Sequence, residues 1–321
     1  MTRAKKASYL LVPVILGLTV WLHLGPVILA GLFSYMVLDV TYRFFQRRLS
    51  RALSLWLALA AFLLAATALS WMLVRFVRQT IHTLPQIAAT AIPRLVVLSD
   101  SHGINLPFDN VDELHEMVIH AIRGNAEAIT KTSGALTTDI FHVLIIMLVA
   151  MLAFFSRQQP VEYGPNLFDT LRRELGARTQ TFLQGFEKVF GAQLAISAAY
   201  AVLTFLFLWT MGYSHVIFLT LASFLFGVLP IIGNLISNII IVASGLAMTT
   251  RHALFALGFL VLIHKSGYLV YGRVLGTSLK VPMWQTLLAI LLGEAALGVP
   301  GMLLAPAMLH YIKEELRAIA D

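Results

Sequence analysis

The chain has 321 residues, of which 59% are hydrophobic and 12% charged, and its mean hydropathy is +0.82. Soluble domains carry roughly a quarter charged residues, so this composition excludes an ordinary soluble protein. The net charge is +7, but the basic residues lie in short segments between apolar runs, a pattern typical of loops at an anionic membrane surface rather than of nucleic-acid binding. The chain has no cysteine, which excludes disulfides and cysteine-ligated metals. We therefore expect an all-α polytopic membrane protein.

The N-terminal transmembrane helices are predicted to occupy residues 1–78. An apolar stretch over 7–38 is interrupted near its middle by Gly25-Pro26, which predicts two short helices or a tight hairpin. Residues 52–74 contain no charged residue and form the clearest single span. Between these stretches lies an arginine-rich loop that should face the cytoplasm. Its arginines are Arg43, Arg47, Arg48 and Arg51.

Residues 79–139 form a polar insertion that contains seven acidic and three basic residues. Apolar residues from Val111 to Ile122 recur at helical spacing, so the insertion should be helical in part. Because it lies on the other side of a span from the arginine-rich loop, we expect it to be extracytoplasmic, with both chain termini in the cytoplasm. Residues 140–156 then return across the membrane. Three prolines punctuate the insertion, namely Pro85, Pro93 and Pro107.

Residues 157–188 are predicted to form a cytoplasmic amphipathic linker. Apolar residues recur there at spacings of three, four or seven, which is typical of a helix that lies on a membrane surface. These residues are Phe168, Leu171, Leu175, Phe182 and Phe186.

Residues 189–312 are predicted to form the C-terminal transport core, followed by a polar tail over 313–321. The first part of the core, 189–250, contains no Asp, Glu, Lys or Arg. This run is too long for two crossings of ~20 residues each and awkward for three. With broken or re-entrant segments included, the chain should have about eight transmembrane helices.

Two helix breaks stand out in the core. One combines Pro230 with Gly233, and the other runs from Gly298 through Pro300 to Gly301. Such breaks survive in a membrane where they are buried in protein or line a wet cavity, and paired breaks mark binding sites in transporters. Replacing Gly233 with Ala should restore helix propensity at its break.

A weak internal symmetry relates residues 7–41 to residues 216–250, since each is an apolar stretch broken near its centre. Inverted repeats with broken helices are common in secondary transporters. Two unrelated helical hairpins are the alternative interpretation.

Polar residues near the breaks are candidate substrate- or ion-binding residues. Glu294 is an acid within a span, where an ionisable group usually lines a cavity, and it is predicted to share a helix face with the glycines of the second break. Its alternative role is a structural pair with Lys265. Asn234 and Asn238 follow the first break at i, i+4, and either line a site or bond helices together. The set predicted from the residues is Pro230, Gly233, Asn234, Asn238, His264, Lys265, Tyr268, Glu294, Gly298 and Gly301.

The sequence contains no complete motif of an enzyme active site. His115 and His120 flank a zinc-protease-like stretch, but residues at i and i+5 lie about 140° apart around a helix, so they cannot share a metal as i, i+4 ligands do. No nucleotide-binding loop or nucleophile elbow is visible in the sequence. We expect neither enzymatic activity nor a bound cofactor.

The C-terminal half, over residues 185–312, resembles the AI-2E family of autoinducer-2 exporter-like membrane proteins. The resemblance rests on the Pro230-x-x-Gly233 break, on Gly272-Arg273-Val274-Leu275-Gly276, and on Leu292-Gly293 followed by Gly298-x-x-Gly301. It adds Arg273 to the candidate residues. Many family members carry a proline where this chain has Gly272 and an acid near Ser266.

The resemblance implies a multi-pass secondary transporter of the bacterial inner membrane that exports a small polar signal or metabolite such as autoinducer-2. It also implies a homo-oligomer, for which the resemblance allows a pentamer, and H⁺ or Na⁺ as the coupling ion. Because some family members look like Na⁺(Li⁺)/H⁺ antiporters, a monovalent cation is the alternative substrate. A non-transporting membrane scaffold is a third interpretation, although a scaffold has no use for two broken helices. The expected partners are lipid and solute, and no nucleic acid.

Overall fold

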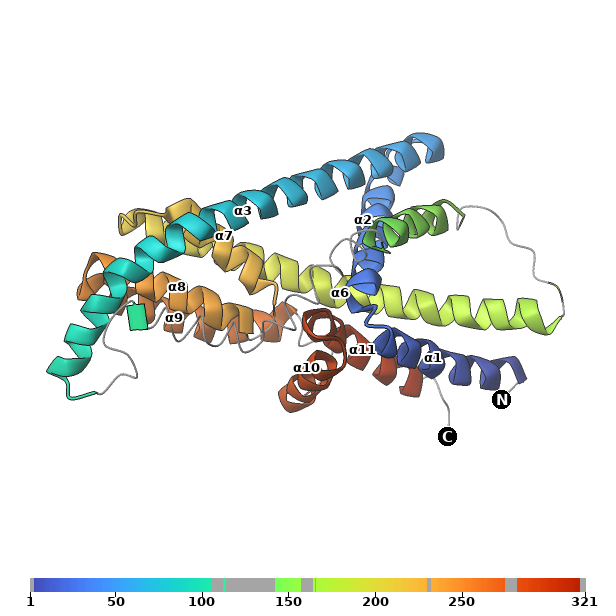
Figure 1. Cartoon of the computed structure of the whole chain (residues 1–321). Helices are drawn as coiled ribbons and strands as arrows, with labels where there is room; N and C mark the ends of the chain where they lie inside the picture. Colours follow the sequence, from blue (N-terminus) through green and yellow to red (C-terminus); the bar gives the residue numbers. More distant parts are fainter. Residues whose placement is uncertain are drawn as a thin grey trace. The chain divides into compact units, whose positions relative to one another are not determined.

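The computed structural model (Figure 1) describes residues 3–104, 112–113, 142–156, 164, 166–229, 232–274 and 282–317, and it gives no side-chain detail for 3–6, 264–274 and 283. The regular elements in these ranges are all α-helices, as the sequence predicts. Three helices are long and apolar enough to cross a membrane, and six shorter apolar helices have 10–17 residues. The all-α membrane class is confirmed, whereas the number of about eight spans stays a prediction.

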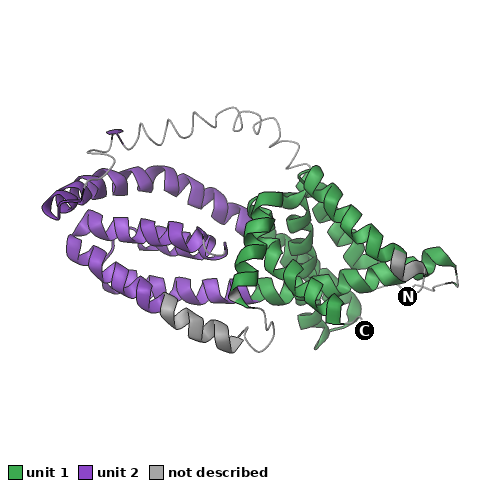
Figure 2. Cartoon of the chain, turned by 90° about the horizontal axis from the view of Figure 1, so that it is seen from below, with its two compact units in different colours: residues 1–68, 136–191, 279–321 green, residues 69–135, 192–278 purple. Residues whose placement is uncertain are grey.

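The chain divides into two compact units, drawn in green and purple in Figure 2. The first unit contains residues 1–68, 136–191 and 279–321, and the second contains residues 69–135 and 192–278. The predicted transport core, 189–312, contributes residues to both.

In the first unit, helices α1 (Arg3–Trp21) and α2 (Gly25–Gln46) meet at the predicted interruption. His23 there adopts a positive φ of 54°, which residues with a side chain rarely take, and the chain turns at this point from α1 into α2. A Cβ on Gly25 would lie 3.2 Å from the Cβ atoms of both Leu297 and Pro300, so α2 begins tightly against the second break. Figure 1 shows α1 and α2 diverging from their junction, so the prediction of two helices is confirmed and the tight hairpin is wrong.

Helix α3 runs without interruption from Arg51 to Ser101. At 1.5 Å per residue it is roughly 77 Å long, more than twice the thickness of a bilayer core. The predicted span 52–74 lies in its first half, and Pro85 and Pro93 lie inside the helix rather than ending it. The expectation that these prolines punctuate the insertion is wrong, because a proline removes one backbone hydrogen bond but a long helix can continue past it.

Helix α6 (Leu167–Thr210) joins the predicted linker to the predicted core as one continuous helix. In the first unit the apolar stripe of the linker packs against protein. The Phe182 ring lies 5.8 Å from the Tyr311 ring, and Phe186, which is fully buried, lies 5.8 Å from Phe33. Only the first stripe residue, Phe168, is largely exposed, at 73%. Two residues of the stripe thus pack against α2 and α11 within the first unit, and the placement of 157–188 as a cytoplasmic linker stays a prediction.

The second unit contains α7 (Val216–Gly227), α8 (Ile232–Met248) and α9 (Thr250–Val274), with α8 packed against both of the others. Its core includes fully buried Leu208, Phe218 and Leu219, together with Ile241 and Ala256. With 12 residues, α7 is about 18 Å long and cannot cross a bilayer core alone. The uncharged run 189–250 therefore consists of the C-terminal part of α6, the short helix α7, and α8, which packs back against α7.

In the first unit, α10 (Met283–Leu297) and α11 (Val299–Arg317) form a second hairpin, and α11 also contacts α2. The proposed symmetry between 7–41 and 216–250 gains no support from these geometries. Both stretches break near their centres, but α7 and α8 pack side by side while α1 and α2 diverge.

Candidate functional site

Each predicted break lies between the two helices of a packed hairpin. The hairpin of α7 and α8 belongs to the second unit, and that of α10 and α11 to the first. In the second unit α7 ends at Gly227, where the Leu229 N–H donates to the Phe226 carbonyl at 2.9 Å. Pro230 lies outside the described residues. Gly233, in the first turn of α8, lies so close to the Phe226 carbonyl that an added Cβ would overlap its oxygen. The sequence analysis treated Gly233 only as a break in helix propensity and did not predict this close contact.

A seam of small polar side chains lies along α6 and α7 toward this break. Gln193 Nε2 donates to the Gly227 carbonyl at 2.8 Å, which ties α6 to the end of α7. Farther along, the hydroxyls of Thr204 and Ser223 lie 3.5 Å apart, both buried. Between these two contacts lies Ser197, which is 1% exposed. The sequence interpretation missed this seam. Its signal in the sequence was the spacing of Gln193, Ser197 and Thr204, which lie at positions i, i+4 and i+11 of one helix.

Helix α8 brings two predicted residues to the break. Asn234 and Asn238 are both half-buried, and the Asn234 carbonyl accepts a hydrogen bond from Ser237 Oγ at 3.1 Å. Ser237 itself is buried. The start of α8 therefore presents amide and hydroxyl groups within a unit that has no charged side chain between residues 189 and 250. That environment suits a neutral or singly charged guest better than a multiply charged one.

Four further predicted residues, His264, Lys265, Tyr268 and Arg273, lie within α9. Their side chains lie outside the described part of the structure, so their role as binding residues stays a prediction.

The second hairpin brings Gly293 of α10 against Gly301 of α11. A Cβ on Gly293 would lie 2.5 Å from the Gly301 carbonyl oxygen, and a Cβ on Gly301 would overlap the Gly293 carbonyl. Gly298 ends α10 with φ 65°, a conformation that favours glycine, and its N–H donates to the Glu294 carbonyl at 2.7 Å. The sequence analysis predicted that Glu294 shares a helix face with Gly298 and Gly301. This prediction is wrong, because α10 ends at Leu297 and Gly301 belongs to the next helix, α11.

Glu294 is exposed on α10 and directly follows Gly293, the glycine that contacts α11. Because Glu294 belongs to the first unit and Lys265 to the second, their predicted pairing stays a prediction.

The first unit also holds a buried ion pair that the sequence interpretation missed. Arg178 of α6 donates from Nη1 to Glu315 Oε2 at 2.8 Å, and their side chains are only 7% and 19% exposed. Tyr9 of α1 donates to the same oxygen at 3.2 Å, and its ring lies under the guanidinium at 3.7 Å. The polar tail is thus fastened to α1 and α6. No local pattern connects residues 137 positions apart.

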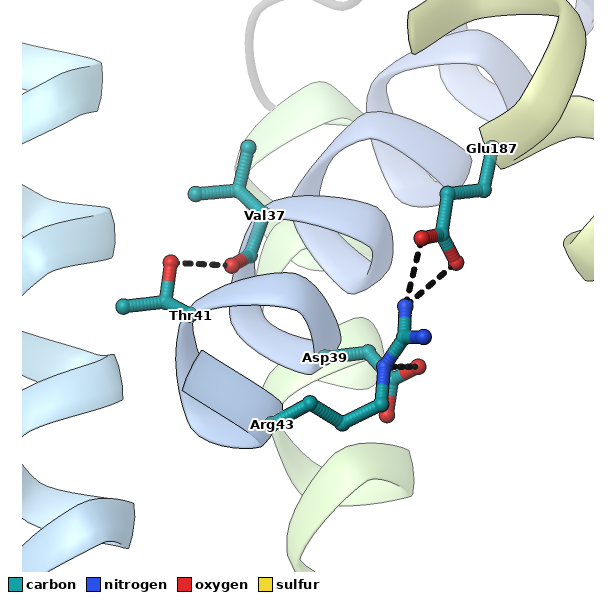
Figure 3. A network of polar contacts seen from close by, with 5 residues as sticks. All are labelled: Val37, Asp39, Thr41, Arg43 and Glu187. Atoms are coloured by element: carbon teal, nitrogen blue, oxygen red, sulfur yellow. Dashed lines mark hydrogen bonds and ion pairs between the residues drawn. The ribbon is translucent and has the colours of Figure 1, made fainter. Parts of the chain in front are cut away.

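A second charged network joins α2 to α6 (Figure 3). Arg43 Nη2 donates to both carboxylate oxygens of Glu187 at 2.5 Å, and Arg43 Nε lies 3.2 Å from Asp39 one turn earlier. Arg43 was predicted only as one residue of a cytoplasmic loop. In the structure it neutralises Asp39, which lies within a candidate membrane span, so this acid has a structural role.

The chain is similar to "Putative transport protein YdbI" of Bacillus subtilis (strain 168), with 22% identity over 177 residues. That match covers 53% of this chain and 50% of the relative, so the chain spans about half the length of that relative. A family model for AI-2E family transporters matches residues 9–321, which include both broken hairpins. The chain therefore belongs to the AI-2E family of transporters.

Proposed function

We propose that the chain is a secondary active transporter that exports a small polar solute, of the autoinducer-2 type, across the bacterial inner membrane. Membership of a transporter family supports the general activity. The observation that carries the proposal further is the α7–α8 hairpin, whose first helix is too short to cross a bilayer and whose break meets a seam of polar side chains. Buried polar groups at membrane depth are costly unless they serve a pathway or bond helices together.

The proposed solute is neutral or singly charged and has hydroxyl or carbonyl groups. Gln193, Ser197 and Asn234 offer amide and hydroxyl groups, which exchange hydrogen bonds with such a solute without a formal charge. A solute with several charges would lack compensating side chains in residues 189–250. A gradient of H⁺ or Na⁺ drives the export, since the sequence contains no nucleotide-binding loop.

The purified full-length chain in liposomes tests this function. We expect labelled autoinducer-2 to move across the membrane when an ion gradient is imposed, and to move more slowly without the gradient or in protein-free liposomes. The same vesicles are assayed for Na⁺ exchange against H⁺ in the absence of organic solute. Exchange of these ions without any solute movement would refute export and would identify the antiporter alternative. Movement of neither solute nor ions, in protein that is folded and inserted, would refute both.

A further inference from the structure

The part of α3 that belongs to the second unit carries two arginines on its outer side. Phe76 points into the unit and stacks on Phe218 of α7, with 5.6 Å between the ring centroids. Arg75 and Arg78 lie on a different side of the helix and are both exposed. Among the described residues, neither of these two arginines forms an ion pair with a carboxylate.

The nearby sequence supplies no acid for this pair of arginines. The second unit consists of residues 69–135 and 192–278, and residues 192–278 contain no Asp or Glu. Within α3 the first acid is Asp100, which lies roughly 33 Å along the helix from Arg78. Two neighbouring like charges on a helix repel each other. An anion from outside the chain would therefore stabilise this part of α3.

Trp71 indicates the depth of the arginine pair in the membrane. Arg75 Cζ lies 4.9 Å from the centre of the Trp71 ring, which is 62% exposed. Exposed tryptophan is typical of the membrane interface, where arginine extends its charge toward the headgroups. No charged residue lies between Arg51 and Arg75, a distance of about 36 Å along the helix. This exceeds the ~30 Å hydrocarbon core but not the ~40–45 Å that includes the headgroups.

The surroundings of the pair favour a lipid over a free anion. Of the three candidate spans α3 is the least covered, since 11% of its most apolar stretch is buried, against 22% in α2 and 28% in α6. Leu64 and Val74, which precede the arginines on the same helix, are 72% and 52% exposed. An anionic phospholipid offers a phosphate to the guanidinium groups and acyl chains to these apolar side chains. Free phosphate offers only the first.

We propose that Trp71, Arg75 and Arg78 bind the headgroup of an anionic phospholipid, in the leaflet opposite the arginine-rich loop. Arginines at i and i+3 are neighbours on a helix, so both guanidinium groups reach one phosphate. The Trp71 ring packs beside the upper part of the acyl chains and supports Arg75. The bound lipid neutralises the pair and fixes the depth at which α3 leaves the hydrocarbon core. This site does not depend on which solute the protein transports.

Trp71 reports on its own lipid neighbours when it is the only tryptophan in the full-length protein. The other four tryptophans are 63–74% exposed, so phenylalanine can replace them without disturbing the core; they are Trp21, Trp56, Trp209 and Trp284. The protein is reconstituted in phosphatidylcholine vesicles that contain a minor share of phosphatidylglycerol. Bromine atoms, which quench tryptophan fluorescence on contact, are placed in the acyl chains of one lipid or of the other.

Two double variants in this single-tryptophan protein separate the site from general charge. Arg75→Gln with Arg78→Gln removes both guanidinium groups, and glutamine keeps the helix propensity of α3. Arg172→Gln with Arg173→Gln is the matched control, because it removes the same charge from two exposed positions of α6. Each sample is measured in chloride and in inorganic phosphate at equal ionic strength.

We expect quenching to show phosphatidylglycerol enriched about tenfold beside Trp71 relative to its share of the vesicle. The enrichment should disappear in Arg75→Gln with Arg78→Gln and persist in the control. Quenching in proportion to each lipid's share in the protein that keeps both arginines would overturn the proposal, and would indicate that acids of the insertion or of a second copy compensate the arginines. Enrichment that survives in Arg75→Gln with Arg78→Gln would also overturn it. Loss of the enrichment in inorganic phosphate would identify a free-anion site instead of a lipid site.

Discussion

Gly301 of α11 lies directly against the backbone carbonyl of Gly293 in α10, so no side chain fits between the two helices at this point. This contact closes the hairpin at the second predicted break. It predicts that Gly301→Ala destabilises the protein, since an overpacked contact costs about 1–3 kcal/mol and the backbone must move. Thermal unfolding in detergent should show a clear fall in Tm. Gly17→Ala, where a Cβ meets nothing within 4 Å, is the control, and an equal Tm in both variants would contradict the packing.

Gly233→Ala tests the corresponding contact at the first break. Helix propensity alone predicts that this change stabilises α8 by about 1 kcal/mol. The structure reverses the sign, because the added Cβ would overlap the Phe226 carbonyl oxygen. We expect a lower Tm and slower solute export. A Tm above that of the wild type would show that propensity outweighs the contact, and the close approach of α7 and α8 would then be wrong.

The buried pair of Arg178 and Glu315 should matter more than an exposed pair on the same helix. Glu315→Gln leaves a buried guanidinium without its carboxylate, which costs on the order of 3 kcal/mol. Glu314→Gln breaks the Arg317–Glu314 pair, whose side chains are 55% and 41% exposed, and should cost less than about 1 kcal/mol. Chemical unfolding measures both. The double variant Arg178→Met with Glu315→Leu should recover most of the loss, and failure to recover it would indicate a further role for Arg178.

The membrane topology gives a fourth prediction. The chain has no cysteine, so a single introduced cysteine reports its own accessibility. Asp100→Cys lies at the far end of α3 and Gln46→Cys shortly before its start, and both positions are exposed. An impermeant maleimide on intact cells should label Asp100→Cys and leave Gln46→Cys unlabelled, because the arginine-rich loop faces the cytoplasm. The reverse pattern would invert the proposed orientation.

Local chemistry explains which features could be predicted from the sequence. Proline and glycine act on their own neighbours, so Gly25-Pro26, Gly233 and Gly298 located the breaks correctly. Continuity of α3 through Pro85 was missed, because whether a proline ends a helix depends on the rest of that helix. The pair of Arg178 with Glu315 and the bond from Gln193 to the Gly227 carbonyl join distant segments, and a single sequence does not specify such contacts. Glu294 was placed on the wrong face because the reversal at Gly298 breaks the helical periodicity assumed for it.

The central claim is that the break between α7 and α8 holds the transport site, and Asn234 tests it most directly. In liposomes with an imposed ion gradient, we compare initial rates of autoinducer-2 movement for the wild type, Asn234→Ala and the control Asn166→Ala, whose side chain bonds Asp169 outside this site. Losing one half-buried hydrogen-bonding group at the transport site should slow transport about tenfold in Asn234→Ala, with Asn166→Ala close to the wild type. A wild-type rate in folded, inserted Asn234→Ala would contradict the claim.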